Sequence, residues 1–188
     1  PYVAIDGHED GLRAASRPGV LPQGYISGVQ AKGMCRASGK RLCGADDWQT
    51  ACRGSADMQF PYGAKRRAKT CNDDVRAVHP VAEVGVLVGL EPKQWWTEGM
   101  NNPLINQLTA GLLPTGERSE CTNDYGVFDM VGNLHEWVDD SEGTFRGGYY
   151  MDTTLNGDGC SYQTTAHSFD YHDYSTGFRC CLDADRVE

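Results

Sequence analysis

The chain has 188 residues, of which 39% are hydrophobic and 23 are glycines. This length suits one domain with one sizeable core, and the many glycines favour a loop-rich α+β fold over a helical bundle. The formal net charge of −9 excludes the broad basic surface that nucleic acid requires. The one basic cluster, Lys65-Arg66-Arg67 with Lys69, is interpreted as a solvated surface turn.

The first elements follow from local signals. Residues 1–26 are expected to form short extended pieces, because glycine and proline interrupt them repeatedly. Ser27 and Gln30 have the spacing of a capping box, which predicts a helix that begins there and ends at Gly39.

A second helix is predicted from about Ala45 to Arg53. Its apolar residues Trp48, Ala51 and Cys52 fall on one face by the three-and-four spacing of a helix. Gly54 then provides a natural end.

The rest of the chain has weaker periodicity. The run 81–90 is apolar and is expected to be a strand or an irregular segment. We expect a long loop over 91–117, and long loops in compact domains are usually functional or mobile. Two short strands are predicted, around 145–150 and 176–181.

The eight cysteines are an even set without the paired C-x-x-C spacing of a zinc site. We therefore expect disulfides and an extracytoplasmic location, whether periplasmic, cell-surface or secreted. No apolar run is long enough to span a bilayer, and no signal peptide or lipidation motif is visible. Because the sequence starts at Pro1 without a methionine, we expect a targeting segment, and part of the fold, to precede it.

Four motifs, taken together and in this order, carry a family resemblance. They are GKRL at 39–42 with Trp48 and ACRG at 51–54, YGVFDMVGNLHEW at 125–137, RGG at 146–148, and GFRC at 177–180. Over residues 27–182 the chain resembles the formylglycine-generating (sulfatase-modifying) enzyme family. The resemblance implies a variant of the C-type lectin fold, built as a single disulfide-stapled domain over residues 1–188.

The resemblance also implies a calcium ion at the central motif. Its ligands would be the side chains of Asp129 and Glu136 and the carbonyls of Gly132 and Leu134, and calcium prefers such hard oxygens at a turn. The alternative is a structural turn whose carboxylates cap nearby amides. Asn72 is a weaker candidate for a second calcium site.

Disulfide pairs follow from the same resemblance. It implies Cys35–Cys180 and Cys52–Cys160, which would staple the two helices to the C-terminal part of the chain. The remaining four cysteines would then pair most simply as Cys43–Cys181 and Cys71–Cys121.

The family's catalytic positions are altered. Its oxidase uses two copper-binding cysteines that follow an Arg-Gly-Gly-Ser turn. Here Tyr149 stands in place of the serine, and Asp152 stands in place of the first cysteine. Cys160 is the one cysteine nearby and is expected in a structural bridge. Copper(I) requires thiolates, so we do not expect formylglycine synthesis by the family's mechanism.

The segment 149–174 is rich in tyrosine, aspartate and histidine, and three interpretations stay open. In the first, His167 and His172, with His135 as a third nitrogen, hold copper, zinc or iron. The catalytic candidates would then be His167, His172, Asp152 and Tyr149. In the second, the segment forms a ligand-binding pocket with the loop around the tryptophans, lined by Trp95, Trp96, Tyr149, Asp152, His167 and His172. In the third, it is a polar loop without a site.

The preferred function is a calcium-stabilised recognition domain for a protein, peptide or carbohydrate ligand. The alternative is a metal-dependent oxidase or a divergent protein-modifying enzyme. Similar C-terminal compositions also occur in hypervariable receptors on this fold. His8 and His79 are interpreted as ordinary surface residues.

Overall fold

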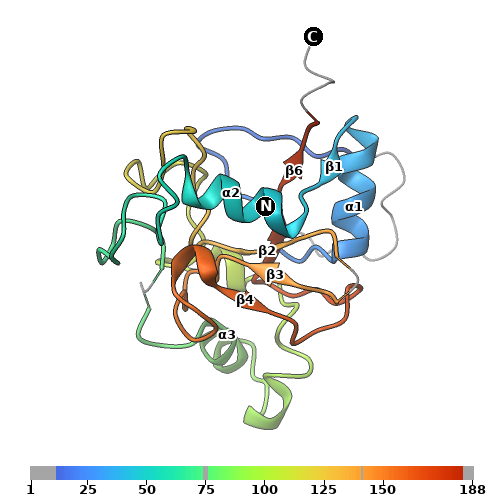
Figure 1. The fold of residues 1–188 in the computed structure, drawn as a ribbon. Helices are drawn as coiled ribbons and strands as arrows, with labels where there is room; N and C mark the ends of the chain where they lie inside the picture. Colours follow the sequence, from blue (N-terminus) through green and yellow to red (C-terminus); the bar gives the residue numbers. More distant parts are fainter. Residues whose placement is uncertain (1–11, 74–75, 141, 184–188) are drawn as a thin grey trace.

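The computed structural model describes residues 12–73, 76–140 and 142–183 (Figure 1). Three α-helices are present in this part: α1 (Gly28–Ala37), α2 (Ala45–Arg53) and α3 (Pro80–Leu87). Three short 3-10 helices accompany them: η1 (Pro92–Gln94), η2 (Ile105–Gln107) and η3 (Gly159–Ser161). The strands are β1 (Arg41–Leu42), β2 (His135–Trp137), β3 (Phe145–Arg146), β4 (Gln163–Thr164), β5 (Thr176–Phe178) and β6 (Cys180–Cys181). This confirms a loop-rich α+β fold.

The strands form two small sheets. One pairs β1 with β6 antiparallel, and the other has the order β4-β3-β2-β5. Within the second sheet β2 and β5 run parallel, so the central motif lies beside the C-terminal strand, with Glu136 opposite Gly177. The strand predicted at 145–150 ends early, because Gly147 and Gly148 take φ angles of 82° and 69° that no strand residue adopts. In Figure 1, α1 and α2 lie on one side of this sheet and α3 on the other.

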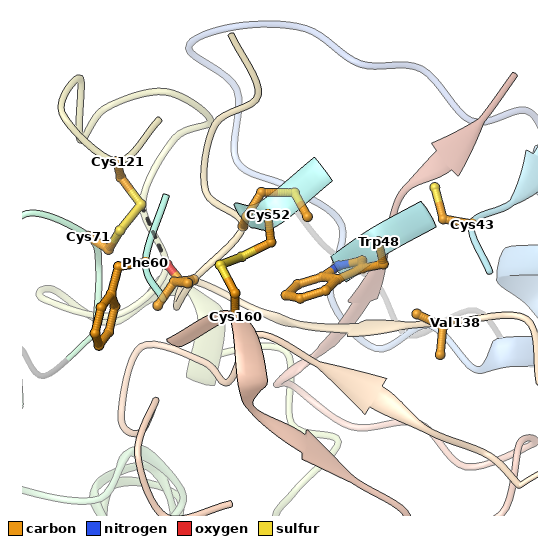
Figure 2. Close-up of a cluster of buried hydrophobic side chains, with 10 residues drawn as sticks. Cys43, Trp48, Cys52, Phe60, Cys71, Cys121, Val138 and Cys160 are labelled. Atoms are coloured by element: carbon orange, nitrogen blue, oxygen red, sulfur yellow. Dashed lines mark hydrogen bonds between the residues drawn. A yellow bond between two sulfur atoms is a disulfide. The ribbon is translucent and has the colours of Figure 1, made fainter. Parts of the chain in front are cut away.

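The first two helices form where local signals predicted them. Ser27 Oγ accepts a hydrogen bond from the Gln30 amide at 3.2 Å, and the Gln30 side chain accepts one from the Ser27 amide at 2.9 Å. This reciprocal pair satisfies two of the amides that a helix start leaves without partners. In α2, Trp48 and Cys52 are fully buried in a core cluster that Figure 2 shows.

The prediction of a strand or irregular segment over 81–90 was wrong, because most of this range lies in α3, which ends at Leu87. Pro80 occupies the first turn, and the His79 side chain caps the helix by accepting a hydrogen bond from the Val81 amide at 3.3 Å. Apolar residues lie on its exposed face as well as on its buried face, with Val86 68% exposed, and Glu83 is its one charged residue. The apolar residues therefore mark no single face of the helix in the sequence.

The loop predicted at 91–117 is confirmed, since it contains only the short helices η1 and η2. Trp95 fixes its start. The Trp95 indole donates a hydrogen bond to the Leu90 carbonyl at 3.0 Å. Its ring lies so close to Gly85 that a Cβ there would come within 2.4 Å of it. Trp95 is therefore a packing residue.

All eight cysteines form disulfides. The bridges are Cys35–Cys180, Cys43–Cys181, Cys52–Cys160 and Cys71–Cys121, which is the pairing that the resemblance implies. Two of them are drawn in Figure 2. Four bridges in one chain indicate an oxidising, extracytoplasmic environment. Within the described ranges no helix is both long and apolar enough to cross a membrane.

Candidate functional site

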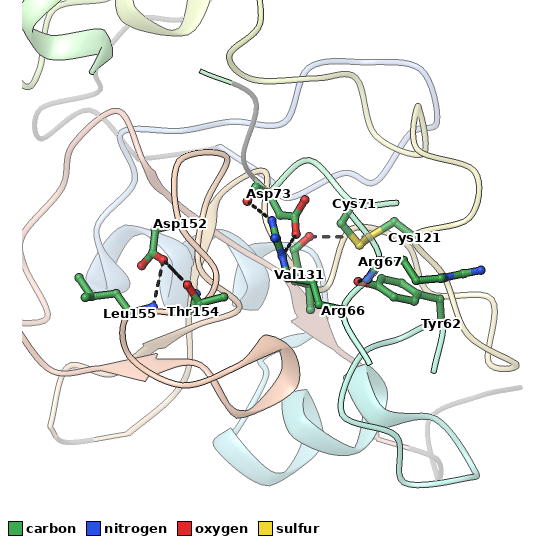
Figure 3. A network of polar contacts seen from close by, with 10 residues as sticks. All are labelled: Tyr62, Arg66, Arg67, Cys71, Asp73, Cys121, Val131, Asp152, Thr154 and Leu155. Atoms are coloured by element: carbon green, nitrogen blue, oxygen red, sulfur yellow. Dashed lines mark hydrogen bonds and ion pairs between the residues drawn. A yellow bond between two sulfur atoms is a disulfide. The ribbon is translucent and has the colours of Figure 1, made fainter. Parts of the chain in front are cut away.

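Tyr149 and Asp152, the two positions that the resemblance assigns to the family's serine and first cysteine, face each other in a tight turn after β3. The Tyr149 amide donates to the Asp152 carbonyl at 2.9 Å, and the Asp152 amide donates back at 3.0 Å. The Asp152 carboxylate accepts hydrogen bonds from the amides of Thr154 and Leu155, at 2.9 and 3.0 Å (Figure 3). Asp152 therefore organises the next turn.

The Tyr149 side chain fills the space beside this turn. Its ring stacks on His135 with centroids 4.7 Å apart, and lies 5.5 Å from the Tyr150 ring and 6.0 Å from the Tyr174 ring. Burial raises the pKa of Tyr149, so the phenol stays neutral at physiological pH. The space beside the turn is thus occupied by the protein's own aromatic side chains.

His135 belongs to the core. It is 7% exposed, and its two ring nitrogens lie 3.2 Å from Ser175 Oγ and 3.3 Å from the Tyr162 hydroxyl. Burial lowers the pKa of His135 to about 3, although the Asp152 charge works in the opposite direction. A neutral imidazole whose nitrogens both have partners is a structural residue here.

The histidines that were predicted to hold a transition metal lie in different surroundings. His167 stacks on Tyr171 with centroids 3.7 Å apart, whereas His172 Nδ1 lies 3.0 Å from the Asn101 side-chain oxygen. Across the described residues no group of three His, Cys, Asp or Glu side chains is arranged to hold a metal ion. Within this part of the chain His135, His167 and His172 are thus not brought together as a group of metal ligands, and a transition metal at the histidines stays a prediction.

The carboxylates of the predicted calcium site have protein partners. Arg179 binds Glu136 in a bidentate pair, with Nε–Oε2 at 2.5 Å and Nη2–Oε1 at 2.6 Å. The Trp48 indole donates to the same carboxylate at 2.6 Å. Asp129 accepts a hydrogen bond from the Gly116 amide at 2.8 Å. A calcium ion would have to share Glu136 with a guanidinium, so only part of the donor set suits the ion. Binding through Asp129, Gly132, Leu134 and Glu136 stays a prediction.

Asn72 braces the same turn from the other side. Its carbonyl accepts a hydrogen bond from the Asn133 amide at 2.9 Å. Its side-chain nitrogen donates to Gly111 O and to Asn133 Oδ1, both at 2.9 Å. In the part of the chain that the structure describes, the side-chain oxygen of Asn72 is buried and has no hydrogen-bond partner. An amide oxygen of this kind can coordinate a hard cation such as calcium. A second calcium ion at Asn72 likewise stays a prediction.

Two segments that were predicted to bind a ligand do lie side by side. The Tyr174 amide donates to the Met100 carbonyl at 3.3 Å, which joins the 91–117 loop to the C-terminal segment. His172 bonds to Asn101 at the same contact. Trp96 is 51% exposed. The juxtaposition creates an aromatic and polar surface.

His79 completes this surface, which corrects its interpretation as an ordinary surface residue. Its ring meets Trp96 edge-on with centroids 4.7 Å apart, and Nε2 lies 3.3 Å from the Tyr174 hydroxyl. Burial lowers the pKa of His79. We call His79, Trp96, Asn101 and His172 the Trp96 surface. His8 lies outside the described residues.

Of the six predicted ligand residues, only Trp96 and His172 belong to the Trp96 surface. Trp95 packs against the core, Tyr149 and Asp152 form the turn after β3, and His167 stacks on Tyr171. His79 and Asn101 were not predicted. One signal was available for His79, because a polar residue directly before a proline and an apolar run is typical of a helix start.

This architecture defines a small disulfide-stapled α+β domain. Residues 6–184 match the family model described as the sulfatase-modifying factor enzyme 1-like domain, and the chain belongs to that family. It is 24% identical, over 88% of its own length, to a Bos taurus protein named inactive C-alpha-formylglycine-generating enzyme 2. The match covers 52% of that relative, so the chain spans about half its length.

A solved structure shows the same fold. PvdO from Pseudomonas aeruginosa superposes with a TM-score of 0.53 and 14% sequence identity. The superposition covers 89% of this chain and 70% of the other. At this identity the likeness concerns the fold alone.

Proposed function

We propose that this chain is a non-catalytic recognition domain that binds a protein, peptide or carbohydrate through the Trp96 surface. The observation that carries the proposal is the meeting of the 91–117 loop with the C-terminal segment. Trp96 stays half exposed against His79, and His172 bonds to Asn101 of the same loop. Exposed tryptophan supplies a large, rigid contact area, and the neighbouring amide and imidazoles supply hydrogen bonds.

The absence of a reactive thiol supports a non-catalytic role. Every cysteine is in a disulfide, so no thiolate is available to bind copper or to exchange with a substrate thiol. The position that the family uses for its first catalytic cysteine holds Asp152, whose carboxylate is bonded to two backbone amides. The filled pocket around Tyr149 leaves binding to the outer surface. That one relative carries the word inactive in its name agrees with this proposal.

Secretion or display at a cell surface is part of the proposal, and the four disulfides support it. A calcium ion at the 129–136 turn would stabilise the scaffold at a distance from the proposed contact surface. The chain's acidic balance, with 26 acidic and 17 basic residues, disfavours nucleic acid as the ligand.

The test uses a displayed random-peptide library and an oligosaccharide array as probes. Binders selected on the wild-type protein are measured again on Trp96→Ala and His172→Ala, and we expect both variants to lose binding. Leu155→Ala is the matched control, because Leu155 is an 82% exposed apolar residue outside this surface. Binders that tolerate Trp96→Ala, or that are lost equally with Leu155→Ala, would contradict the proposal.

A further inference from the structure

The basic segment 64–69 takes no part in the Trp96 surface. All six of its residues are exposed, and none belongs to a helix or strand. The segment contains Lys65, Arg66, Arg67 and Lys69 in a chain whose net charge is −9. Exposed loop tips are the preferred sites at which proteases cut folded proteins, because the backbone there is reachable without unfolding the core.

The two arginines of this segment are held very differently (Figure 3). Arg66 Nε binds Asp73 Oδ2 at 2.9 Å, and the Asp73 side chain is only 1% exposed. The Arg67 side chain is 56% exposed, lies over the Tyr62 ring at 4.8 Å and reaches Glu120 only at 3.9 Å. Such surface contacts contribute little, so Arg67 can leave them for a protease pocket while Arg66 stays anchored.

We propose that the Arg67–Ala68 bond is a processing site for a trypsin-like serine protease, whose primary pocket places a carboxylate against a guanidinium. Water adds across this amide: the C–N bond breaks, Arg67 acquires a carboxylate and Ala68 acquires an ammonium group. No other bond of the protein changes, and the reaction needs no oxidant or cofactor. Ala68 and Lys69 on the leaving side are exposed and present no bulky obstacle to the enzyme.

The disulfides decide what this cut produces. Three bridges join a cysteine before the bond to one after it, namely Cys35–Cys180, Cys43–Cys181 and Cys52–Cys160. The cleaved chain therefore stays covalently linked as a two-chain protein. The fourth bridge, Cys71–Cys121, lies wholly in the second fragment and holds the chain just behind the new amino terminus. Cleavage therefore converts the single chain into two disulfide-linked chains, and the domain stays assembled.

The test treats the folded, oxidised protein with a limiting amount of trypsin. Intact mass and amino-terminal sequencing are recorded before and after reduction. We expect the first cut between Cys35 and Cys181 to fall after Arg67, and the fragments 1–67 and 68–188 to separate only after reduction. Arg67→Gln should lose this cut. Arg36→Gln is the matched control, because Arg36 is an exposed arginine inside helix α1.

Three results would overturn the proposal. The first internal cut could fall at a bond other than Arg67–Ala68, the fragments could separate without reduction, or Arg67→Gln could be nicked within the segment at the wild-type rate. An unchanged melting temperature of Arg67→Gln shows that a lost cut reflects the missing side chain and not a stiffer or looser fold.

Discussion

Acidification from about pH 7.5 to about pH 5 should destabilise the folded protein through His135. Burial lowers the pKa of this imidazole from 6.5 to about 3. The unfolded chain therefore takes up a proton as the pH falls below 6.5, while the folded chain does not. The free energy of unfolding decreases through that window until the pH reaches about 3. At about pH 5 the loss is roughly 2 kcal/mol, at about 1.36 kcal/mol for each pH unit below 6.5.

Urea unfolding followed by tryptophan fluorescence measures this loss. With a denaturant slope of about 2 kcal/mol per molar urea, the midpoint should fall by about 1 M between the two pH values. His135→Phe keeps a ring in the same position without an ionisable nitrogen. Its former partners retain other hydrogen bonds, since Ser175 Oγ donates to Asp173 at 2.7 Å and the Tyr162 hydroxyl accepts from Asn156 at 3.0 Å.

His135→Phe should therefore fold and show a smaller fall in midpoint than the wild-type protein. The remaining fall has the same sign and includes His79, whose pKa burial also lowers. If wild type and His135→Phe lost the same stability between the two pH values, the reasoning about a buried neutral imidazole would be refuted.

Three other predictions concern the scaffold. Replacing Cys71 and Cys121 together by serine opens a loop with a sequence separation of 50. It should lower the free energy of unfolding by roughly 4 kcal/mol in urea titrations, and an unchanged midpoint would contradict the bridge. Gly132→Ala should cost at least about 2 kcal/mol, because φ is +79° and the new Cβ would lie 2.2 Å from a backbone carbonyl oxygen. Gly126→Ala is the control, because φ is similar at +70° but no atom lies within 4 Å of the new Cβ. It therefore measures the cost of the backbone conformation alone. Equal urea midpoints for the two variants would rule out a steric clash at Gly132. Calcium should raise the melting temperature of the wild-type protein and not that of Asp129→Ala. No shift in the wild-type protein would contradict the calcium site and would mean that Arg179 is the cation that neutralises Glu136.

Local signals in the chain were sufficient for the elements that short-range hydrogen bonds define. The Ser27 and Gln30 side chains cap α1 from three residues apart, and the apolar face of α2 is visible in the spacing of Trp48 and Cys52. By contrast the pattern did not reveal α3, since its exposed face also carries apolar residues, Val86 and Leu87, which leaves little contrast between its faces. The motifs identified the family, and the resemblance, not spacing alone, implied the disulfide pairs.

The candidate site could be predicted only in part. Trp95 and Trp96 are neighbours of the same type, yet one fills a space over Gly85 and the other is half exposed. Nothing local distinguishes them. The histidines His167 and His172 also lie close in sequence, but His167 stacks on Tyr171 within the same segment, whereas His172 bonds to Asn101 in the 91–117 loop.

The sequence by itself therefore determined the family and the first two helices, because identity and near-neighbour spacing encode these features. Only the tertiary structure decided that Tyr149 stacks on His135, that Glu136 pairs with Arg179 and that His79 joins Trp96 at the surface. The physical reason is that these contacts join segments far apart in the chain. Their energies depend on burial and on partner geometry that no local pattern records.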